Sequence, residues 1–231
     1  MSLLGRFLEI SVQTGDIRES SEFYEALGFR HCAVGETWPH PYAVLSDGRL
    51  FLGLHEYAFP SPAITFARPG LARHLPELER RGVRFEFRKT GEEDFNEAGF
   101  LDPDGHMFAL LEARTYSPPA FDGRDFSLLG AFGDYALPVR GLERSLTFWQ
   151  RLDVTPAAQE AAPWPIAILE AGDARIGLHE TAGLSRPALR FTSCGRGAQR
   201  KVLIDRGFPV DDTPAGPALR SPEGLVLLVD T

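Results

Sequence analysis

The chain has 231 residues, of which 43% are apolar and 24% are charged, proportions typical of a folded globular protein and not of a disordered or fibrous one. Its 32 acidic and 24 basic residues give a net charge of −8, which disfavours nucleic acids and anionic membranes as partners because both are negatively charged. Cys32 and Cys194 form no CxxC motif, so we expect a cytoplasmic protein without a disulfide framework.

The first quarter of the chain predicts a strand, a helix and then two or three further strands. Residues 7–13 alternate and are rich in β-branched and aromatic side chains, which is typical of a half-buried strand. Asp16 can cap a helix, with Glu19 reaching back, and the apolar stripe of that helix stops at Gly28. Strands are then predicted over residues 42–45 and 50–57.

The second quarter repeats this order. We predict a strand over 63–67, a helix over 71–81 and strands over 83–88, 99–101 and 107–112. Pro76 lies inside the helical segment, where it removes a backbone hydrogen bond, so we expect that helix to be irregular. The turn Asp102-Pro103-Asp104-Gly105 joins the last two strands.

The second half of the chain repeats the first. Ser20 and Ser145 are 125 residues apart, and Tyr24 is separated from Trp149 by the same number. The segment 53–56 (GLHE) recurs at 177–180, and Trp38-Pro39 is matched to Trp164-Pro165. Near the end the offset falls to 119, which separates Pro103 from Pro222, so the second copy has lost part of a loop.

The repeat predicts two tandem domains. We assign residues 1–115 to the first domain and residues 130–231 to the second. The connecting linker is assigned to residues 116–129, in a stretch that contains Pro-Pro, Gly and charged residues.

The two motifs together resemble the vicinal oxygen chelate superfamily. They are the helix motif D-x-x-x-S-x-x-F-Y-x-x-L-G-F at residues 16–29 and the D-P-D-G turn at 102–105. This superfamily includes glyoxalase I, extradiol dioxygenases, and fosfomycin and bleomycin resistance proteins. The resemblance implies an α+β fold in which four βαβββ units form two tandem glyoxalase/bleomycin-resistance-like domains with cupped mixed sheets.

The resemblance also implies where a metal would bind. In the superfamily a divalent ion is held by His, Gln or Glu side chains on the first strand and a late strand of each unit. Transferred to this chain, these positions are Glu9, Gly53, Ala63 and Ala109 in the first half, and Asp134, Gly177, Ala188 and Leu228 in the second. Since each half keeps one carboxylate and a stable site needs three or four ligands, we expect neither a metal nor another cofactor.

Two histidines extend these positions. His55 and His179 follow Gly53 and Gly177 by two residues, so they lie on the same face of the strand. Each half then contains an acid and a histidine, Glu9 with His55 and Asp134 with His179, which are the only catalytic candidates. A metal ligand or a general base is one interpretation; we favour pocket-lining histidines that are hydrogen-bonded to the nearby acid.

The remaining candidates are aromatic. Trp38, Trp164 and Tyr42 can line a pocket for a flat ligand, although paired tryptophans are more often core residues. The residues expected to contact a ligand are therefore Glu9, Trp38, Tyr42, Gly53, His55, Asp134, Trp164, Gly177 and His179.

Three functions remain open from the sequence. The favoured one is a metal-free protein that binds a small molecule, because Gly, Ala and Leu at the ligand positions leave apolar cups. The first alternative is a metal-dependent lyase, isomerase or dioxygenase with displaced ligands, and the second is an assembly module with vestigial pockets. The expected partner is a small molecule, with no nucleic acid and no membrane, and a homodimer is compatible with the fold.

Overall fold

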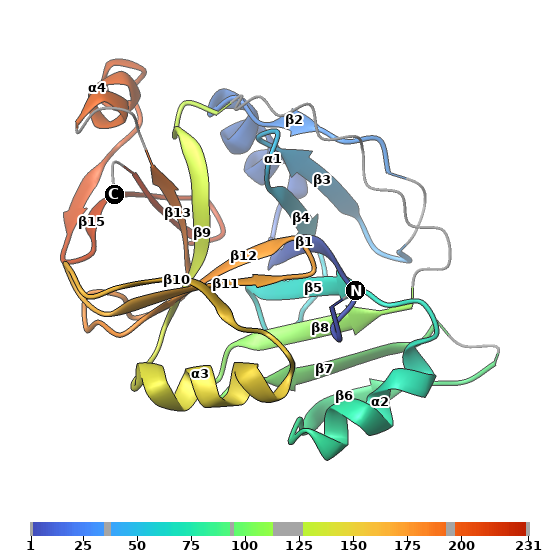
Figure 1. Cartoon of the computed structure of the whole chain (residues 1–231). Helices are drawn as coiled ribbons and strands as arrows, with labels where there is room; N and C mark the ends of the chain where they lie inside the picture. The colour runs from blue at the N-terminus through green and yellow to red at the C-terminus, as the bar shows by residue number, and fades with distance from the viewer. Residues whose placement is uncertain (1, 35–37, 93–94, 113–126, 193–196, 230–231) are drawn as a thin grey trace. The chain divides into compact units, whose positions relative to one another are not determined.

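The computed structural model describes residues 2–34, 38–92, 95–112, 127–192 and 197–229. Within these ranges it contains four helices and two eight-stranded mixed sheets, and each sheet is built from one half of the chain (Figure 1). No helix in these ranges is both long and apolar enough to cross a membrane. The α+β class, the four βαβββ units and the mixed sheets are confirmed.

The first sheet has the strand order β2-β3-β4-β1-β5-β8-β7-β6. Strands β1 and β4 are parallel, as are β5 and β8, and the hairpin neighbours are antiparallel. The elements of this half are β1 (Arg6–Gln13), α1 (Ile17–Ala26), β2 (Arg30–His31), β3 (Tyr42–Ser46), β4 (Phe51–His55), β5 (Ala63–Ala67), α2 (Leu71–Arg80), β6 (Phe85–Lys89), β7 (Glu97–Leu101) and β8 (Met107–Leu111).

The second sheet has the equivalent order β10-β11-β12-β9-β13-β16-β15-β14. Strands β13 and β16 are parallel, and β13 is antiparallel to β9. The elements of this half are β9 (Ala131–Pro138), α3 (Leu142–Arg151), β10 (Pro156–Glu160), β11 (Ile166–Ala171), β12 (Ala174–His179), β13 (Ala188–Thr192), α4 (Ala198–Asp205), β14 (Asp211–Thr213), β15 (Gly216–Arg220) and β16 (Val226–Leu228).

Helix α1 begins where the sequence predicts. The Asp16 side chain accepts hydrogen bonds from the backbone N–H groups of Arg18 and Glu19 at 2.9 and 3.0 Å, so it caps the first turn. The N–H of Asp16 itself donates to Thr14 Oγ1 at 3.1 Å. The acceptor of this bond is therefore Thr14, and not Glu19 as predicted.

Helix α2 differs from the prediction. It is a single ten-residue helix that passes through Pro76 without a break. Proline removes one hydrogen bond, the one to the carbonyl of Ala72, and the buried residues Leu71, Leu75 and Leu78 anchor the helix on both sides of it. The helix is therefore not split at Pro76, contrary to one form of the expected irregularity.

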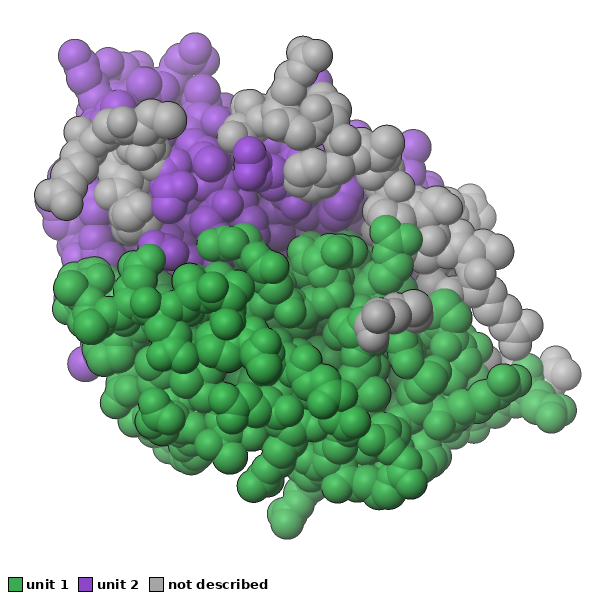
Figure 2. Space-filling view, in the orientation of Figure 1, with its two compact units in different colours: residues 1–9, 63–118, 137–181 green, residues 10–62, 119–136, 182–231 purple. Residues whose placement is uncertain are grey.

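Spatial proximity along the backbone divides the chain into two compact units (Figure 2), and each unit draws on both halves. Unit 1 consists of residues 1–9, 63–118 and 137–181, and unit 2 of residues 10–62, 119–136 and 182–231. Each hydrogen-bonded sheet thus belongs to one half of the sequence, whereas each compact unit contains segments of both halves. Most of the predicted linker 116–129, like Cys194, lies outside the described residues.

In unit 1 the turn before β8 contacts helix α3. The Asp104 carboxylate accepts hydrogen bonds from the backbone N–H of Arg140 at 3.0 Å and from Ser145 Oγ at 2.8 Å, and it forms an ion pair with Arg144 at 2.5 Å. Burial alone raises the pKa of Asp104, but these donors outweigh it, so the pKa lies below its usual value. The turn is therefore held to α3 by a charged contact.

Unit 2 contains the same contact between the corresponding elements. Glu223, in the turn before β16, accepts hydrogen bonds from Ser20 Oγ at 3.0 Å and from the hydroxyl of Tyr24 on α1. Burial and the Glu223 charge raise the pKa of Tyr24 well above its usual value, which keeps the phenol protonated as the donor. Because Ser20 and Ser145 occupy equivalent positions, the two units share one packing solution.

Candidate functional site

The four predicted catalytic candidates are all buried. Relative exposure is 1% for Glu9, 5% for His55, and 0% for both Asp134 and His179. Glu9 and His179 belong to unit 1, whereas Asp134 and His55 belong to unit 2, so each predicted acid–histidine pair is divided between the units. Three of the four have well-defined partners within their own unit.

Asp134 is paired with a residue that the sequence analysis missed. Arg190 on β13 lies opposite Asp134 on β9, and its Nε donates to Asp134 Oδ2 at 2.7 Å while Nη2 bonds the same oxygen. The Asp134 side chain is fully buried and that of Arg190 is 17% exposed. The available signal was an arginine two residues after Ala188, within the repeat of the strand predicted over 63–67, because a charge in a buried strand requires a partner of opposite sign.

The hydrogen bond from Trp164 selects one tautomer of the His179 ring. The indole Nε1–H of Trp164 donates to His179 Nδ1 at 3.1 Å. Because an indole nitrogen can only donate, Nδ1 carries no proton, and the neutral ring carries its proton on Nε2. Metal-binding histidines have the opposite arrangement, in which one nitrogen donates to a protein acceptor and the other keeps its lone pair for the metal.

His55 has an equivalent partner in His40. His40 Nε2 lies 3.0 Å from His55 Nδ1, and burial together with the nearby His55 ring lowers the pKa of His40. The strand register pairs Tyr42 with His55 and Ile166 with His179. Tyr42 and Ile166 are 124 residues apart, and so are His55 and His179. At the same offset His40, and not Trp38, corresponds to Trp164. This corrects the sequence alignment of the two tryptophans.

The His55 ring lies within an aromatic cluster of unit 2. His40 is stacked between Trp38 and Tyr57, with centroid distances of 5.5 and 5.0 Å, and Tyr42 lies 4.6 Å from His55. Tyr57 is 59% exposed, so the cluster reaches the surface. Trp38 and Tyr42 therefore lie together with His55, whereas Trp164 contacts the buried His179. That these residues contact a ligand stays a prediction.

The two glycines at the transferred ligand positions lie inside the sheets. Gly53 is paired with Ser11 and Val44, and Gly177 is paired with Ile168. No group of three or more His, Cys, Asp or Glu side chains within the described ranges can hold a metal ion. Because Asp134 is bound to Arg190 and His179 accepts from Trp164, the donor set of the second half does not fit the metal that the superfamily uses.

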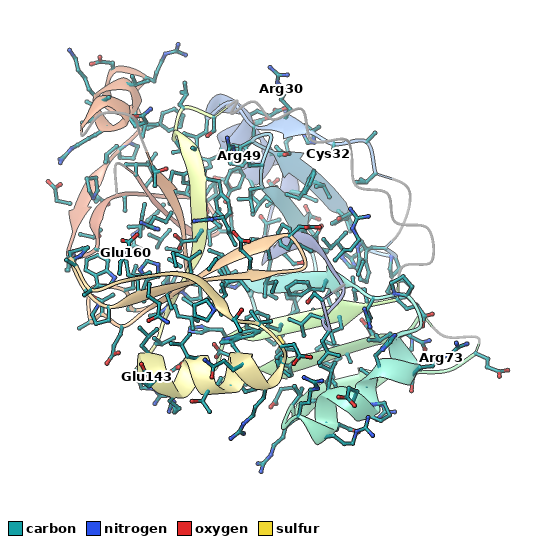
Figure 3. The ribbon with its side chains drawn as sticks, viewed as in Figure 1. Arg30, Cys32, Arg49, Arg73, Glu143 and Glu160 are labelled. Carbon is teal, nitrogen blue, oxygen red and sulfur yellow. The ribbon has the colours of Figure 1, made fainter. Side chains whose placement is uncertain are left out.

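A separate hollow of about 660 Å³ lies on unit 1. Its lining is polar, and its carboxylates have basic partners: Asp153 with Arg81 at 2.7 Å and Glu170 with Arg175 at 3.4 Å. It contains none of the predicted site residues. Other charged side chains, such as Arg73 on α2 and Glu143 on α3, lie on exposed helix faces (Figure 3).

Comparison with known proteins identifies the fold. No family model and no curated protein sequence matches the chain. Among solved structures, a catechol 2,3-dioxygenase matches with a TM-score of 0.58 and 13% identity over 96% of this chain and 86% of the other. A mutant of 4-hydroxymandelate synthase from Streptomyces coelicolor matches with a TM-score of 0.59 and 15% identity, covering 96% and 91% of the two chains.

A third match is an extradiol ring-cleaving dioxygenase from B. fuscum, with a TM-score of 0.61 and 13% identity over 98% of this chain and 72% of the other. All three are proteins of the vicinal oxygen chelate superfamily, and they cover both halves of this chain. The similarity therefore establishes the tandem two-domain fold, while the chemistry of the site depends on the residues described above.

Proposed function

We propose that this chain, which has the tandem fold of the vicinal oxygen chelate superfamily, is a metal-independent protein that binds a small organic molecule. Its relatives in structure are dioxygenases and a synthase, and the shared fold by itself leaves the function open. The proposal rests on the side chains that replace the superfamily's ligands.

The observation that carries the proposal is the ion pair between Asp134 and Arg190. A guanidinium group neutralises the one carboxylate that remains at a ligand position of the second half. A divalent cation would have to displace this bound cation and would find no donor atom at Gly177, Ala188 or Leu228. The same positions in the first half, Gly53, Ala63 and Ala109, also lack donor side chains, as a site for an uncharged organic ligand requires.

The alternative is a metal-dependent enzyme. It is favoured by the names of the structural neighbours, which include two ring-cleaving dioxygenases. It requires ligands from positions outside the superfamily pattern, supplementing Glu9 and His55 or Asp134 and His179.

Metal analysis combined with thermal unfolding separates the two functions. The protein is purified without chelators, its content of Zn, Mn, Fe, Ni and Co is measured, and its melting temperature is recorded with each ion and with a panel of small organic compounds. The proposal predicts far less than one metal per chain and a raised melting temperature with at least one organic compound alone. A stoichiometric metal whose removal lowers the melting temperature contradicts it.

The proposal also includes the setting of the protein. The separated cysteines favour a cytoplasmic location. Because βαβββ units can pair between chains as well as within one, the proposal includes a homodimer. Light scattering after size-exclusion chromatography measures the molar mass and so tests this directly.

A further inference from the structure

A β-bulge in unit 1 turns one aromatic side chain toward the face of the sheet that α3 does not cover. Phe85 on β6 pairs with Phe100, which contacts Phe148 on α3 at a centroid distance of 6.3 Å. The register of β6 shifts between Phe85 and Phe87, so Phe87 pairs with Gly99 on the opposite face. Bulges of this kind redirect a side chain and are enriched beside functional sites.

The face that Phe87 reaches is made of small groups. A Cβ atom built on Gly99 would lie 2.1 Å from the Phe87 ring, so the ring lies directly over this glycine. Across the sheet, Gly99 pairs with Ala109, and Ala109 pairs with Thr65. Ala109 lies on an inner strand and is still half-buried, while Phe87 and Leu101 are 40% and 37% exposed. Thr65, at 3% exposure, and Gly99 are buried, so the row is accessible at Ala109 and at its Phe87 end.

The corresponding row of the second half is filled. Leu228 stands where the first half has Ala109, Ala218 where it has Gly99, and Arg190 where it has Thr65. Leu228 is 1% exposed and Ala218 is 2% exposed, and Arg190 is bound to Asp134. The exposed Asp211 pairs with Ala218 and so occupies the position that Phe87 has in the first half.

We propose that the row Thr65–Ala109–Gly99 with the Phe87 ring is the ligand site, that its counterpart around Leu228 is closed, and that the ligand is a flat aromatic compound without negative charge. This inference rests on the proposed function and adds the place and the class of ligand. Small side chains beside an exposed aromatic ring form a surface on which a second ring stacks or packs edge to face.

The charges near this row disfavour an anionic ligand. Lys89, the basic residue on the same face of β6, lies opposite Glu97 in the strand register, so the charges of these two residues sum to zero. The buried carboxylate Glu9 lies on β1, the next strand beyond β5, and the chain as a whole carries a net charge of −8. These charges sum to a negative value beside the row, which disfavours an anion there.

The test uses two probes that share a ring system and differ in charge, 2-naphthol and 2-naphthoate. Binding to the full-length protein is measured by ligand-observed NMR and by isothermal titration. We expect 2-naphthol to bind at least about tenfold more tightly than 2-naphthoate at pH 7. We expect F87A to weaken 2-naphthol binding by about tenfold, in line with the loss of one aromatic contact, and A109L, which installs the leucine of the second half, to abolish it.

Two variants serve as controls. Phe95 is 41% exposed, close to the value for Phe87, and lies outside the row, so F95A should leave the affinity unchanged. L228A removes the filling side chain of the second half and should leave the affinity of the first site unchanged. Melting curves of all variants show whether each one is folded.

The outcomes separate this inference from the proposed function. If 2-naphthol binds and folded F87A and A109L bind it as tightly as the native protein, the location is wrong while small-molecule binding stands. If 2-naphthoate binds as tightly as 2-naphthol, or if neither binds, the ligand class is wrong. A stoichiometric functional metal overturns the proposed function itself.

Discussion

Replacing Arg190 with methionine tests the ion pair on which the proposed function rests. The change leaves the fully buried Asp134 carboxylate without its guanidinium partner while keeping an apolar side chain of similar length. At an effective dielectric constant of about 20, two charges about 4 Å apart attract by about 4 kcal/mol, and breaking a buried pair typically costs about 3 to 5 kcal/mol. Since Arg190 is 17% exposed, we expect a loss of about 3 kcal/mol at pH 7.

The assay is urea unfolding of the native protein, R190M, D134N and the double variant, which together form a double-mutant cycle. The double variant should regain most of the lost stability, because it buries no unpaired charge. As a control, R175M removes an exposed pair with Glu170 and should cost less than about 0.5 kcal/mol. A cost for R190M no larger than that for R175M, or no coupling in the cycle, would refute the reasoning.

Three further predictions concern stability and protonation. D104N should destabilise the protein by about 1 to 3 kcal/mol at pH 7, as measured by urea unfolding, because the carboxylate accepts several hydrogen bonds. Since the pKa of Asp104 is lowered, the difference in stability should vanish as the pH falls through that pKa, and a difference that is constant with pH would contradict this prediction. G5A should lower stability by at least about 2 kcal/mol, because φ is +106° and a Cβ would lie 2.3 Å from the Ala67 carbonyl oxygen; a melting temperature equal to that of the native protein would argue against this close approach. Long-range ¹H–¹⁵N NMR should find the neutral His179 ring with its proton on Nε2, and a proton on Nδ1 in the native protein would show the assignment to be wrong. W164F should abolish that tautomer preference and lower the free energy of unfolding by about 1 to 3 kcal/mol.

The fold was largely predictable because its signals are local. Asp16 and Gly28 delimit α1, and the repeat transferred each element to the second half. The error at Pro76 arose because propensity was applied without tertiary packing, which holds α2 together through its three buried leucines.

The site was less predictable because its partners are set by strand register. His40 and Trp164 occupy equivalent positions only when Tyr42 and Ile166 are aligned through their pairing with His55 and His179. Sequence matching aligned the two Trp-Pro dipeptides and so missed His40. Phe87 was missed for a similar reason, since a bulge changes the face of a residue without any mark in the alternation of the strand.

The repeated contact between an acidic turn and a helix serine has a consequence for the origin of the chain. Asp104 binds Ser145 in unit 1 and Glu223 binds Ser20 in unit 2, so each contact joins one half to the other. An ancestor with a single half could make both contacts by associating with an identical copy, as a two-fold symmetric assembly does. Because the two halves belong to one chain, the same association is intramolecular here, so each half has a high effective concentration for the other. The halves are not identical, since Arg190 and Leu228 of the second half stand where the first half has Thr65 and Ala109.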